Sequence, residues 1–374
     1  MSNNTQPEIR FPGFTEDWEQ RKLGDFIDVK SGKDYKHLNS GSIPVYGTGG
    51  YMLSVDRALS DIDAIGIGRK GTIDKPYLLK APFWTVDTLF YAVPKQNIDL
   101  QFSLSIFKKI NWKKFDESTG VPSLSKTVIN SVGASVSSYE EQQKIGSFFK
   151  QLDETIALHQ RKLDLLKETK KGFLQKMFPK NGAKVPEIRF PGFTEDWEER
   201  KLGDIFVYKQ GQQVPVENQF TKRGKNRHRF IRIVDLTTNN EAPRYIEYSG
   251  DNIISSTDLF MIRYGQPGVI GYGYEGVIAN NLFKLIPKIE TYNLFFKYIL
   301  DSMYPKIQSL SSSTTMPAIS FKSLDVLAVR YPDKKEQEKI GSFFAQLDNT
   351  IAHHQRKLDL LKETKKGFLQ KMFV

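Results

Sequence analysis

The chain has 374 residues, of which 39% are hydrophobic and 12% aromatic, so it can hold two or three packed domains and is not a disordered polypeptide. Its formal net charge of +11 favours an anionic partner such as nucleic acid. The absence of cysteine excludes disulfides and thiolate zinc sites and makes a reducing cytoplasm the expected location. A polar beginning and the lack of a long apolar run predict no signal peptide, no transmembrane helix and no membrane partner.

Two blocks of sequence occur twice. Residues 7–25 recur almost unchanged as 186–204, and residues 144–178 recur almost unchanged as 339–373. The long segments between these blocks scarcely resemble each other. A solenoid would show many short repeats, so two long units indicate a pseudo-symmetric pair of domains on a shared frame.

The two variable segments predict mixed α/β domains. Runs of β-branched and aromatic residues predict strands, and longer apolar runs predict helices, although they leave the topology open. The expected strands are 64–67, 90–93, 230–234 and 281–286, and the expected helices are 100–110 and 292–304.

Faint matches between the variable segments indicate that both adopt one fold. The glycine-containing segment 69–73 is matched with 266–270, and 119–125 is matched with 314–320. We interpret these matches as glycine turns and apolar strands that the two domains share.

The second repeated block has the heptad spacing of a coiled coil, with apolar positions separated by alternating steps of four and three. Ser138 and Asp333, each followed three residues later by Glu, predict capping boxes at the helix starts. The seam residues of the two helices are Ile145, Phe149, Leu152, Ile156, His159, Leu163 and Leu166, and Ile340, Phe344, Leu347, Ile351, His354, Leu358 and Leu361.

Nearly identical seams predict that the two helices pair with each other. Antiparallel pairing would give the chain internal pseudo-twofold symmetry, and a parallel homodimer between chains is the alternative. The expected fold class is therefore α+β, with two mixed α/β domains joined by two long antiparallel coiled-coil helices. The expected boundaries are 1–138 for the first domain, 139–178 for the central helix, 179–185 for a linker, 186–332 for the second domain and 333–374 for the distal helix.

A search for catalytic motifs yields no catalytic residue and no metal ligand. The chain lacks the Asn/Asp-Pro-Pro-aromatic corner of amino-methyltransferases and a phosphate-binding Gly-x-x-x-x-Gly-Lys-Ser/Thr loop. The nuclease-like triplets 168–170 and 363–365 lie in the heptad helices, where solvated helix faces are expected. Glycine-rich 46–51 is predicted to be a loop. We expect no cofactor to be bound by this chain.

Basic loops are the candidates for binding DNA. Residues 222–232 hold six Lys or Arg and no acid, and arginine can bond both O6 and N7 of guanine. The weaker equivalents in the first half are residues 69–71 and 30–36. For all three segments an ordinary solvated loop is the alternative. The candidate DNA-binding residues are Lys33, Lys36, Arg69, Lys70, Ser118, Thr119, Lys222, Arg223, Lys225, Arg227, Arg229, Arg232, Ser313 and Thr314.

Taken together, essentially the whole chain resembles the specificity subunit of type I restriction–modification enzymes. The resemblance is carried by the Phe-Pro-Gly-Phe…Trp…Lys-Leu-Gly-Asp opening of each half, the two divergent domains and the two long helices that begin Glu-Gln-x-Lys-Ile. The Pro-x-Leu/Ile-Ser stretches at 122–125 and 317–320 are also similar to those that close target recognition domains in this family.

This resemblance implies a non-catalytic subunit whose two target recognition domains each read one half of an asymmetric, bipartite site in double-stranded DNA. It also implies that the helices set the half-site spacing and dock two modification subunits, which methylate adenine, while two restriction/translocase subunits can join them. S-adenosylmethionine, ATP and Mg are then expected on the partner subunits. Two alternatives remain: a non-catalytic coiled-coil adaptor without sequence-specific DNA binding, and a fragment of a fused methyltransferase–nuclease.

Overall fold

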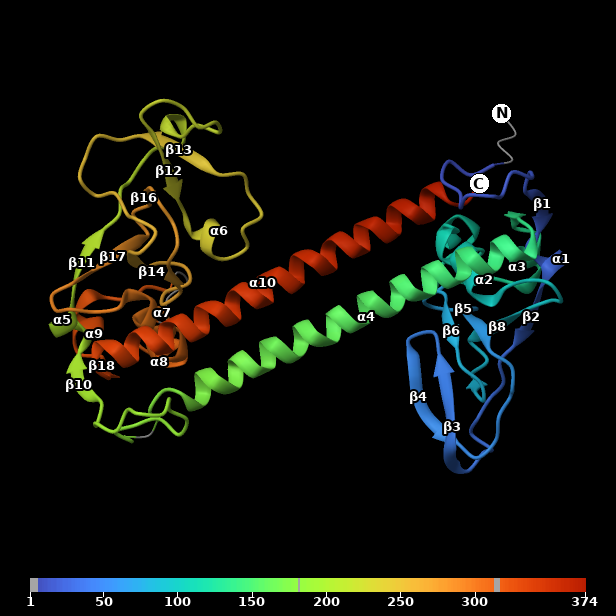
Figure 1. Cartoon of the computed structure of the whole chain (residues 1–374), viewed down its shortest axis with the longest axis horizontal. Coiled ribbons are helices and arrows are strands. Elements are labelled where there is room, and N and C mark those ends of the chain that lie inside the picture. Colours follow the sequence, from blue (N-terminus) through green and yellow to red (C-terminus); the bar gives the residue numbers. More distant parts are fainter. Residues whose placement is uncertain (1–5, 181, 313–316) are drawn as a thin grey trace. The chain divides into compact units, whose positions relative to one another are not determined.

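The computed structural model forms two compact units, and the division between them falls inside the two long helices (Figure 1). The first unit comprises Met1–Arg161 and Gln355–Val374, and the second comprises Lys162–His354. Each long helix therefore contributes one part to each unit. The structure describes residues 6–180, 182–312 and 317–374.

The first unit is built on a four-stranded sheet with the order β2-β8-β5-β6, a three-stranded sheet β4-β3-β7 and a two-stranded sheet β1-β9. Its strands are β1 (Glu19–Lys22), β2 (Ile27–Ser31), β3 (Ser40–Gly47), β4 (Gly50–Val55), β5 (Ala64–Gly68), β6 (Tyr77–Leu79), β7 (Trp84–Thr85), β8 (Leu89–Pro94) and β9 (Gly133–Val136). Its helices are α1 (Leu23–Phe26), α2 (Leu100–Lys109), η1 (Trp112–Phe115) and α3 (Lys126–Ser131), and the long helix α4 (Tyr139–Lys176) begins in it.

The second unit repeats this plan with the sheets β11-β17-β14-β15, β13-β12-β16 and β10-β18. Its strands are β10 (Glu198–Lys201), β11 (Phe206–Gln210), β12 (Arg227–Ile231), β13 (Arg244–Glu247), β14 (Leu259–Ile262), β15 (Ile270–Gly271), β16 (Val277–Ile278), β17 (Leu282–Pro287) and β18 (Ala328–Tyr331). Its helices are α5 (Leu202–Ile205), η2 (Val216–Asn218), α6 (Ile233–Leu236), α7 (Asn293–Ser302), α8 (Tyr304–Ser309) and α9 (Phe321–Asp325), and the long helix α10 (Lys334–Lys371) begins in it.

The two units share even their unusual strand pairing. In the first unit β3 pairs in parallel with β7, with Val45 opposite Trp84, and in the second β12 pairs in parallel with β16, with Phe230 opposite Val277. The expectation of one fold for both variable segments is therefore correct. The predicted strands at 64–67, 90–93 and 281–286 lie on β5, β8 and β17, and the two predicted helices are α2 and α7.

Two local predictions were wrong. The strand expected over 230–234 ends at Ile231, because the carboxylate of Asp235 accepts the Arg232 N–H at 2.8 Å and starts the short helix α6. The glycine-rich segment 46–51 is the tip of the β3–β4 hairpin rather than a loop, with Gly47 opposite Gly50. Gly50 has a φ of 106°, which a residue with a side chain rarely adopts.

The predicted match of 69–73 with 266–270 was wrong by three residues. The Arg69 N–H donates to the Thr88 carbonyl at 2.8 Å, and the Arg263 N–H donates to the Asn281 carbonyl at the same distance. These contacts follow equivalent strands, so Arg69 corresponds to Arg263. Gly68 and Gly71 are three residues apart, as are Gly265 and Gly268. This repeated spacing of glycines allowed the shifted alignment.

Each long helix begins with a capped first turn, but the predicted capping boxes are only half formed. Ser138 Oγ accepts the Glu141 N–H at 3.4 Å, as a capping residue does. The Glu141 carboxylate does not accept the Ser138 N–H, as the second bond of a capping box would require. It is fully buried and accepts hydrogen bonds from Arg10 at 2.7 and 2.9 Å and from Trp18 at 3.1 Å. The first repeated block is thereby fixed to the helix start.

The second unit uses the same device. Asp333 Oδ1 accepts the Glu336 N–H at 3.2 Å, and the buried Glu336 carboxylate accepts hydrogen bonds from Arg189 at 2.7 and 2.8 Å. An ion pair in which arginine donates two hydrogen bonds to one carboxylate is both strong and geometrically specific. In both units the first repeated block is therefore joined to the first turn of the long helix, just before the second repeated block.

The core of the first unit is closed by the end of α10. Phe373 is 5% exposed, and its ring centroid lies 5.9 Å from that of Trp18, 5.4 Å from Phe102 and 5.8 Å from Phe149. In this unit the two long helices run antiparallel, since Phe148 of α4 contacts Phe368 of α10, whereas the later residue Asp153 pairs with the earlier residue Lys365.

The core of the second unit is closed by the end of α4 in the same way. Phe178 lies 6.3 Å from Trp197, 5.8 Å from Phe295 and 5.8 Å from Phe344 by ring centroids. Antiparallel pairing holds here too, since Phe173 of α4 lies 5.1 Å from Phe343 of α10, whereas the earlier residue Lys170 pairs with the later residue Asp348.

The residues named for the helix seam are all buried or half-buried, with Leu163 and Leu358 each 1% exposed. A burial pattern of this kind is what the heptad spacing predicts for a seam. Within the described ranges, no helix is long and apolar enough to cross a membrane.

Removing the ring that closes the first core should destabilise the chain. We predict that Phe373→Ala lowers the free energy of unfolding by about 3–5 kcal/mol, because it deletes a buried aromatic side chain in contact with three others. Chemical denaturation measures this loss. Leu360→Ala, on the same helix but 68% exposed, is the matched control and should change stability by less than about 0.5 kcal/mol. Equal effects of the two changes would contradict this assignment of the core.

Candidate nucleic-acid interface

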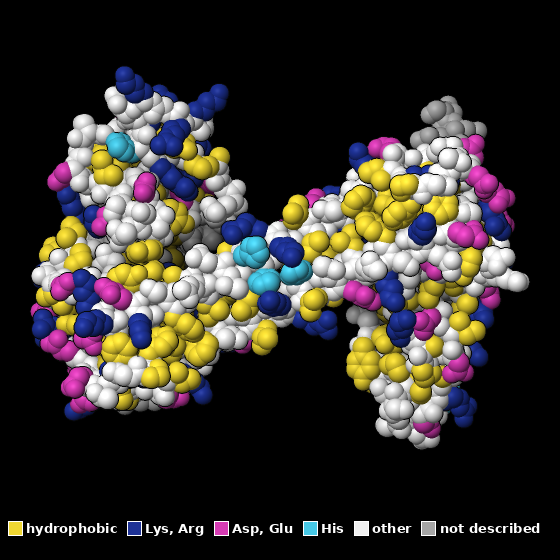
Figure 2. Space-filling model, viewed as in Figure 1, with side chains coloured by type: hydrophobic (Ala, Val, Ile, Leu, Met, Phe, Trp, Pro, Cys, Tyr) yellow, Lys and Arg dark blue, Asp and Glu magenta, His cyan; other side chains and the backbone are white. Residues whose placement is uncertain are grey.

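The basic segment of the second unit divides into an exposed loop and a supported strand. Lys222, Arg223 and Lys225 are exposed, and none of the three forms an ion pair with another described residue. Asn226 then turns the chain with a φ of 60° into β12. Figure 2 shows Lys and Arg side chains gathered over the end of this unit that carries β12 and β13. These three cationic groups are available to a ligand.

The remaining arginines of this segment are half-buried and hold its shape. Arg227 lies over the ring of Phe220, with 3.4 Å between Cζ and the ring centroid. Arg229 and Arg232 lie 3.1 and 3.4 Å from the carboxylate of Asp235, whose side chain is 1% exposed. A buried carboxylate needs such partners. Arg229 and Arg232 therefore have a structural role, because they hold β12 and the residues after it against Asp235.

A hollow of about 750 Å³ opens beside β12. Its lining includes Arg223, Arg227 and Arg229 together with Tyr274 and the acidic Glu275. Burial raises the pKa of Tyr274 against the opposing effect of Arg229, so its hydroxyl stays protonated and donates to the Asp235 carbonyl at 2.9 Å. The hollow is therefore a mainly basic, preformed surface of the kind that phosphates or base edges can enter.

In the first unit the predicted basic residues Arg69 and Lys70 lie at a turn that is hydrogen-bonded to the connection between η1 and α3. Arg69 and Lys70 are exposed at the end of β5, and the next residue, Gly71, donates its N–H to the Pro122 carbonyl at 2.8 Å. Ser118 and Thr119 belong to the same connection. Residues separated by about 50 positions in the sequence thus form one surface.

The connection that carries Ser118 is shaped by Asp116. Its carboxylate accepts the N–H groups of Ser123 at 2.9 Å and of Ser118 at 3.0 Å. These hydrogen bonds hold the pKa of Asp116 below its ordinary value. The loop conformation is therefore kept by an ionised carboxylate at neutral pH.

The other candidates lie elsewhere. Lys33 and Lys36 are exposed on the segment after β2, where the Lys33 N–H donates to the Thr85 carbonyl at 2.8 Å and its carbonyl accepts from Trp84 at 2.8 Å. Ser313 and Thr314 lie outside the described residues. Sequence reasoning missed Arg263, the counterpart of Arg69, because it matched Arg69 with Gln266; the Arg-x-Gly triplets at 69–71 and 263–265 are the signal that could have found it.

The nuclease-like triplet of the central helix has a structural use. Lys170 Nζ lies 2.6 Å from Asp348 of α10, so it is a packing contact and not the fully solvated face that the sequence suggested. Among the described residues, no group of three or more His, Cys, Asp or Glu is arranged to hold a metal ion.

Comparison with known proteins gives matches along the whole chain. A family model described as the type I restriction modification DNA specificity domain matches residues 15–168 and again residues 194–363. The chain is 20% identical to the type I restriction enzyme MjaIX specificity subunit of Methanocaldococcus jannaschii, over 95% of this chain and 92% of that protein. It is 23% identical to the MjaVIII specificity subunit of the same organism, over 52% of this chain and 44% of that protein.

The fold is also found among solved structures. The S subunit of the type I restriction–modification system of M. genitalium superposes with a TM-score of 0.73 at 17% identity, covering 99% of both chains. At this identity the likeness shows a shared fold.

The buried carboxylate beneath the basic loop offers a direct test of how that loop is held. We predict that Asp235→Ala lowers the free energy of unfolding by about 1–3 kcal/mol, because it leaves the Arg232 N–H and the half-buried Arg229 guanidinium without their carboxylate acceptor and removes the ion pair with Arg232. Urea denaturation measures the loss, and limited proteolysis should show faster cleavage within 222–232. Glu241→Ala removes an exposed partner of Arg232 and should cost less than about 1 kcal/mol. If both variants resist proteolysis as well as the unaltered chain, Asp235 does not hold the loop.

Proposed function

The chain belongs to the type I restriction–modification DNA specificity family, and we propose that each of its two units reads one half of an asymmetric, bipartite DNA site. The chain thus supplies DNA sequence specificity. The observation that carries the proposal is a pair of domains with the same sheets but different exposed loops. Phosphate contacts position a protein on DNA, whereas base contacts specify the sequence, so domains with different loops should accept different half-sites.

The long helices are proposed to act as a spacer. Their heptad seams and the antiparallel contacts within each unit support an antiparallel coiled coil between two target recognition domains, at 1–138 and 186–332, in a pseudo-twofold arrangement. A rigid spacer fixes the number of base pairs between half-sites, as dimer geometry does in other DNA-binding proteins.

The helices are also proposed to dock two modification subunits. Leu165 of α4 and Leu360 of α10 occupy matching positions in the repeated block, and each is 68% exposed. A single exposed leucine is ordinary on a protein surface, but its repetition at the same place in both long helices offers two equal apolar contacts. Two equal contacts fit two copies of one partner.

Catalysis is assigned to those partners and not to this chain. The sequence carries no methyltransferase corner and no phosphate-binding loop, so adenine methylation with S-adenosylmethionine and ATP-driven translocation would belong to modification and restriction subunits. A coiled-coil adaptor without DNA specificity is disfavoured by the family match.

The division of the DNA site between the units can be tested in the source organism. Genome-wide mapping of methylated adenine should find a bipartite motif that disappears when the gene for this chain is deleted. Replacing Lys222, Arg223 and Lys225 together by alanine should relax or weaken one half of that motif only, because these residues lie in one unit. Replacing Lys33 and Lys36 by alanine is the matched control and should affect the other half. Equal changes in both halves would contradict the assignment, and methylation or cleavage by the purified chain alone would contradict the non-catalytic role.

The docking role of the exposed leucines gives a second test. We predict that Leu165→Asp combined with Leu360→Asp abolishes co-purification with the modification subunit while leaving the stability of the chain within about 0.5 kcal/mol. Leu158→Asp is the control, because this leucine is 58% exposed but is replaced by histidine in the second copy. Normal assembly of the double variant would rule out this docking surface.

A further inference from the structure

The first unit contains a hollow of about 530 Å³ at the turn after β5, and most of the charged side chains that line it are cationic. Arg69, Lys70 and Lys126 line it together with the acidic Glu117. Neither lysine forms an ion pair with any other described residue, whereas Glu117 accepts the Ser125 N–H at 2.7 Å. The hollow therefore offers two unpaired ammonium groups, while its carboxylate already has a donor.

The rest of this hollow consists of hydroxyl groups and an aromatic floor. Ser31 at the end of β2 and Ser123 line it, and Phe90 of β8 lies beneath Arg69, with 5.8 Å between the guanidinium carbon and the ring centroid. The Arg69 guanidinium also donates to the Asp87 carbonyl at 3.4 Å, which keeps it at the rim. Hydroxyl donors beside fixed cations are suited to an oxyanion.

The second unit has the same backbone at this place, which allows a residue-by-residue comparison. The Leu124 N–H donates to the Arg69 carbonyl at 2.9 Å, and the Ile319 N–H donates to the Arg263 carbonyl at 3.0 Å. One residue further on, Ser125 and Ser320 cap the short helices α3 and α9. The first residues of these helices, Lys126 and Phe321, therefore correspond.

In the second unit the corresponding space is filled. The ring of Phe321 lies 5.1 Å from those of Tyr208 and Phe283, and the guanidinium carbon of Arg263 lies 4.4 Å from it. Arg263 also donates to Gln210 at 2.8 Å, and Gln210 stands where the first unit has Ser31. An arginine held in this way is not available to a ligand, so the difference between the units lies in a few side chains on one scaffold.

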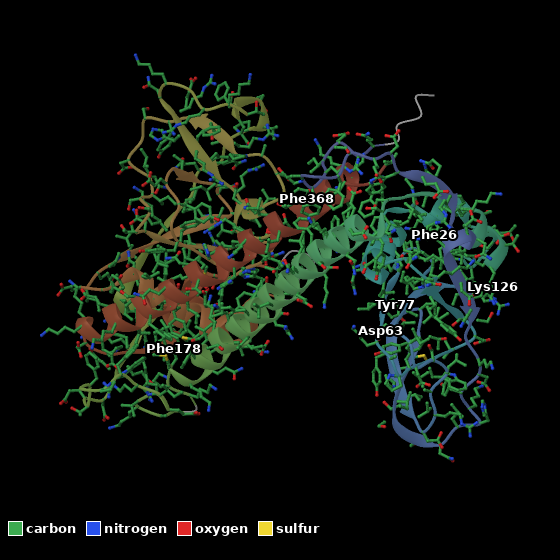
Figure 3. All side chains as sticks on the ribbon, turned by 45° about the vertical axis from the view of Figure 1, so that its right-hand side comes forward. Phe26, Asp63, Tyr77, Lys126, Phe178 and Phe368 are labelled. Carbon is green, nitrogen blue, oxygen red and sulfur yellow. The ribbon has the colours of Figure 1, made fainter. Side chains whose placement is uncertain are left out.

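From this difference we propose that the hollow of the first unit holds a backbone phosphate of the bound DNA, and that the second unit has no such contact at the corresponding place. The inference rests on the proposed function, since it names a contact within the proposed DNA interface. Lys126 and Lys70 neutralise the phosphate, and Arg69 and the serine hydroxyls donate to its oxygens. Figure 3 labels Lys126, which the sequence analysis did not name as a candidate.

The test uses the full chain assembled with its modification subunits and a labelled duplex that carries the methylated motif. Binding is measured over a series of NaCl concentrations. Each lost phosphate contact should reduce the slope of log K against log salt by about 0.9. We expect this reduction in Lys126→Phe, which installs the residue that the second unit has, and in Lys70→Ala. Lys114→Ala, an exposed lysine on η1 outside the hollow, should leave the slope unchanged.

A second arm separates DNA phosphate from free phosphate. Inorganic phosphate is titrated into the complex without DNA and followed by calorimetry. No saturable binding that depends on Lys126 is expected. Saturable binding of inorganic phosphate that Lys126→Phe removes, together with an unchanged salt slope, would show a site for free anions and overturn the proposal. The proposal would also be overturned if Lys126→Phe and Lys70→Ala both left the salt slope unchanged while their complexes melted at the same temperature as the unaltered complex.

The methylated motif and the salt slope separate the phosphate contact from the proposed function. A phosphate contact carries no sequence information, so Lys126→Phe should weaken binding without changing the methylated motif. A complex that recognises no motif at all would count against the proposed function. A complex that recognises its motif with an unaltered salt slope would count only against the phosphate contact.

Discussion

The core of each unit is completed by residues at the end of a long helix that begins in the other unit. Met372 and Phe373 lie in the core of the first unit, although they directly follow a helix that starts at Lys334 in the second. Phe178 and Met177 do the same for the second unit. Burial of large apolar side chains is the main favourable term in folding, so neither core is complete without both helices. This constraint explains why the helical block tolerates so little change between its two copies, while the segments between have diverged.

A second constraint connects the first repeated block to the start of each long helix. The fully buried Glu141 and Glu336 are stabilised by Arg10 and Arg189, each directly before the Phe-Pro-Gly-Phe segment of its own unit. A buried carboxylate without a partner is costly, so loss of either arginine would leave an uncompensated charge in the core. The presence of this arginine in both 7–25 and 186–204 therefore has a physical cause, since both segments present the same guanidinium to the same helix turn.

On this fixed frame the variable parts differ where they meet solvent. The sheet orders and the parallel pairs β3–β7 and β12–β16 are the same, but the short hairpin tip at Gly47–Gly50 is replaced by a longer connection that contains α6. The hollow that stays open around Lys126 is filled by Phe321 in the second unit. Backbone hydrogen bonds specify the scaffold in both units, whereas single side chains at its edges change the surface offered to a ligand. Two different surfaces on one scaffold suit a subunit that supplies DNA sequence specificity.

The sequence by itself determined the duplication, the heptad helices, the α+β class and a few of the buried strands, namely β5, β8 and β17, because periodicity and repetition are local properties. It also led to the family, which the match along both halves confirms. Only the tertiary structure decided which helix end completes which core, since the two helical blocks are nearly identical and their partners are set by packing. It also decided that Arg229 and Arg232 hold Asp235, and that Lys126 lies beside Arg69 and Lys70. The first relation depends on the burial of one carboxylate and the second joins segments far apart in the sequence, and local spacing records neither.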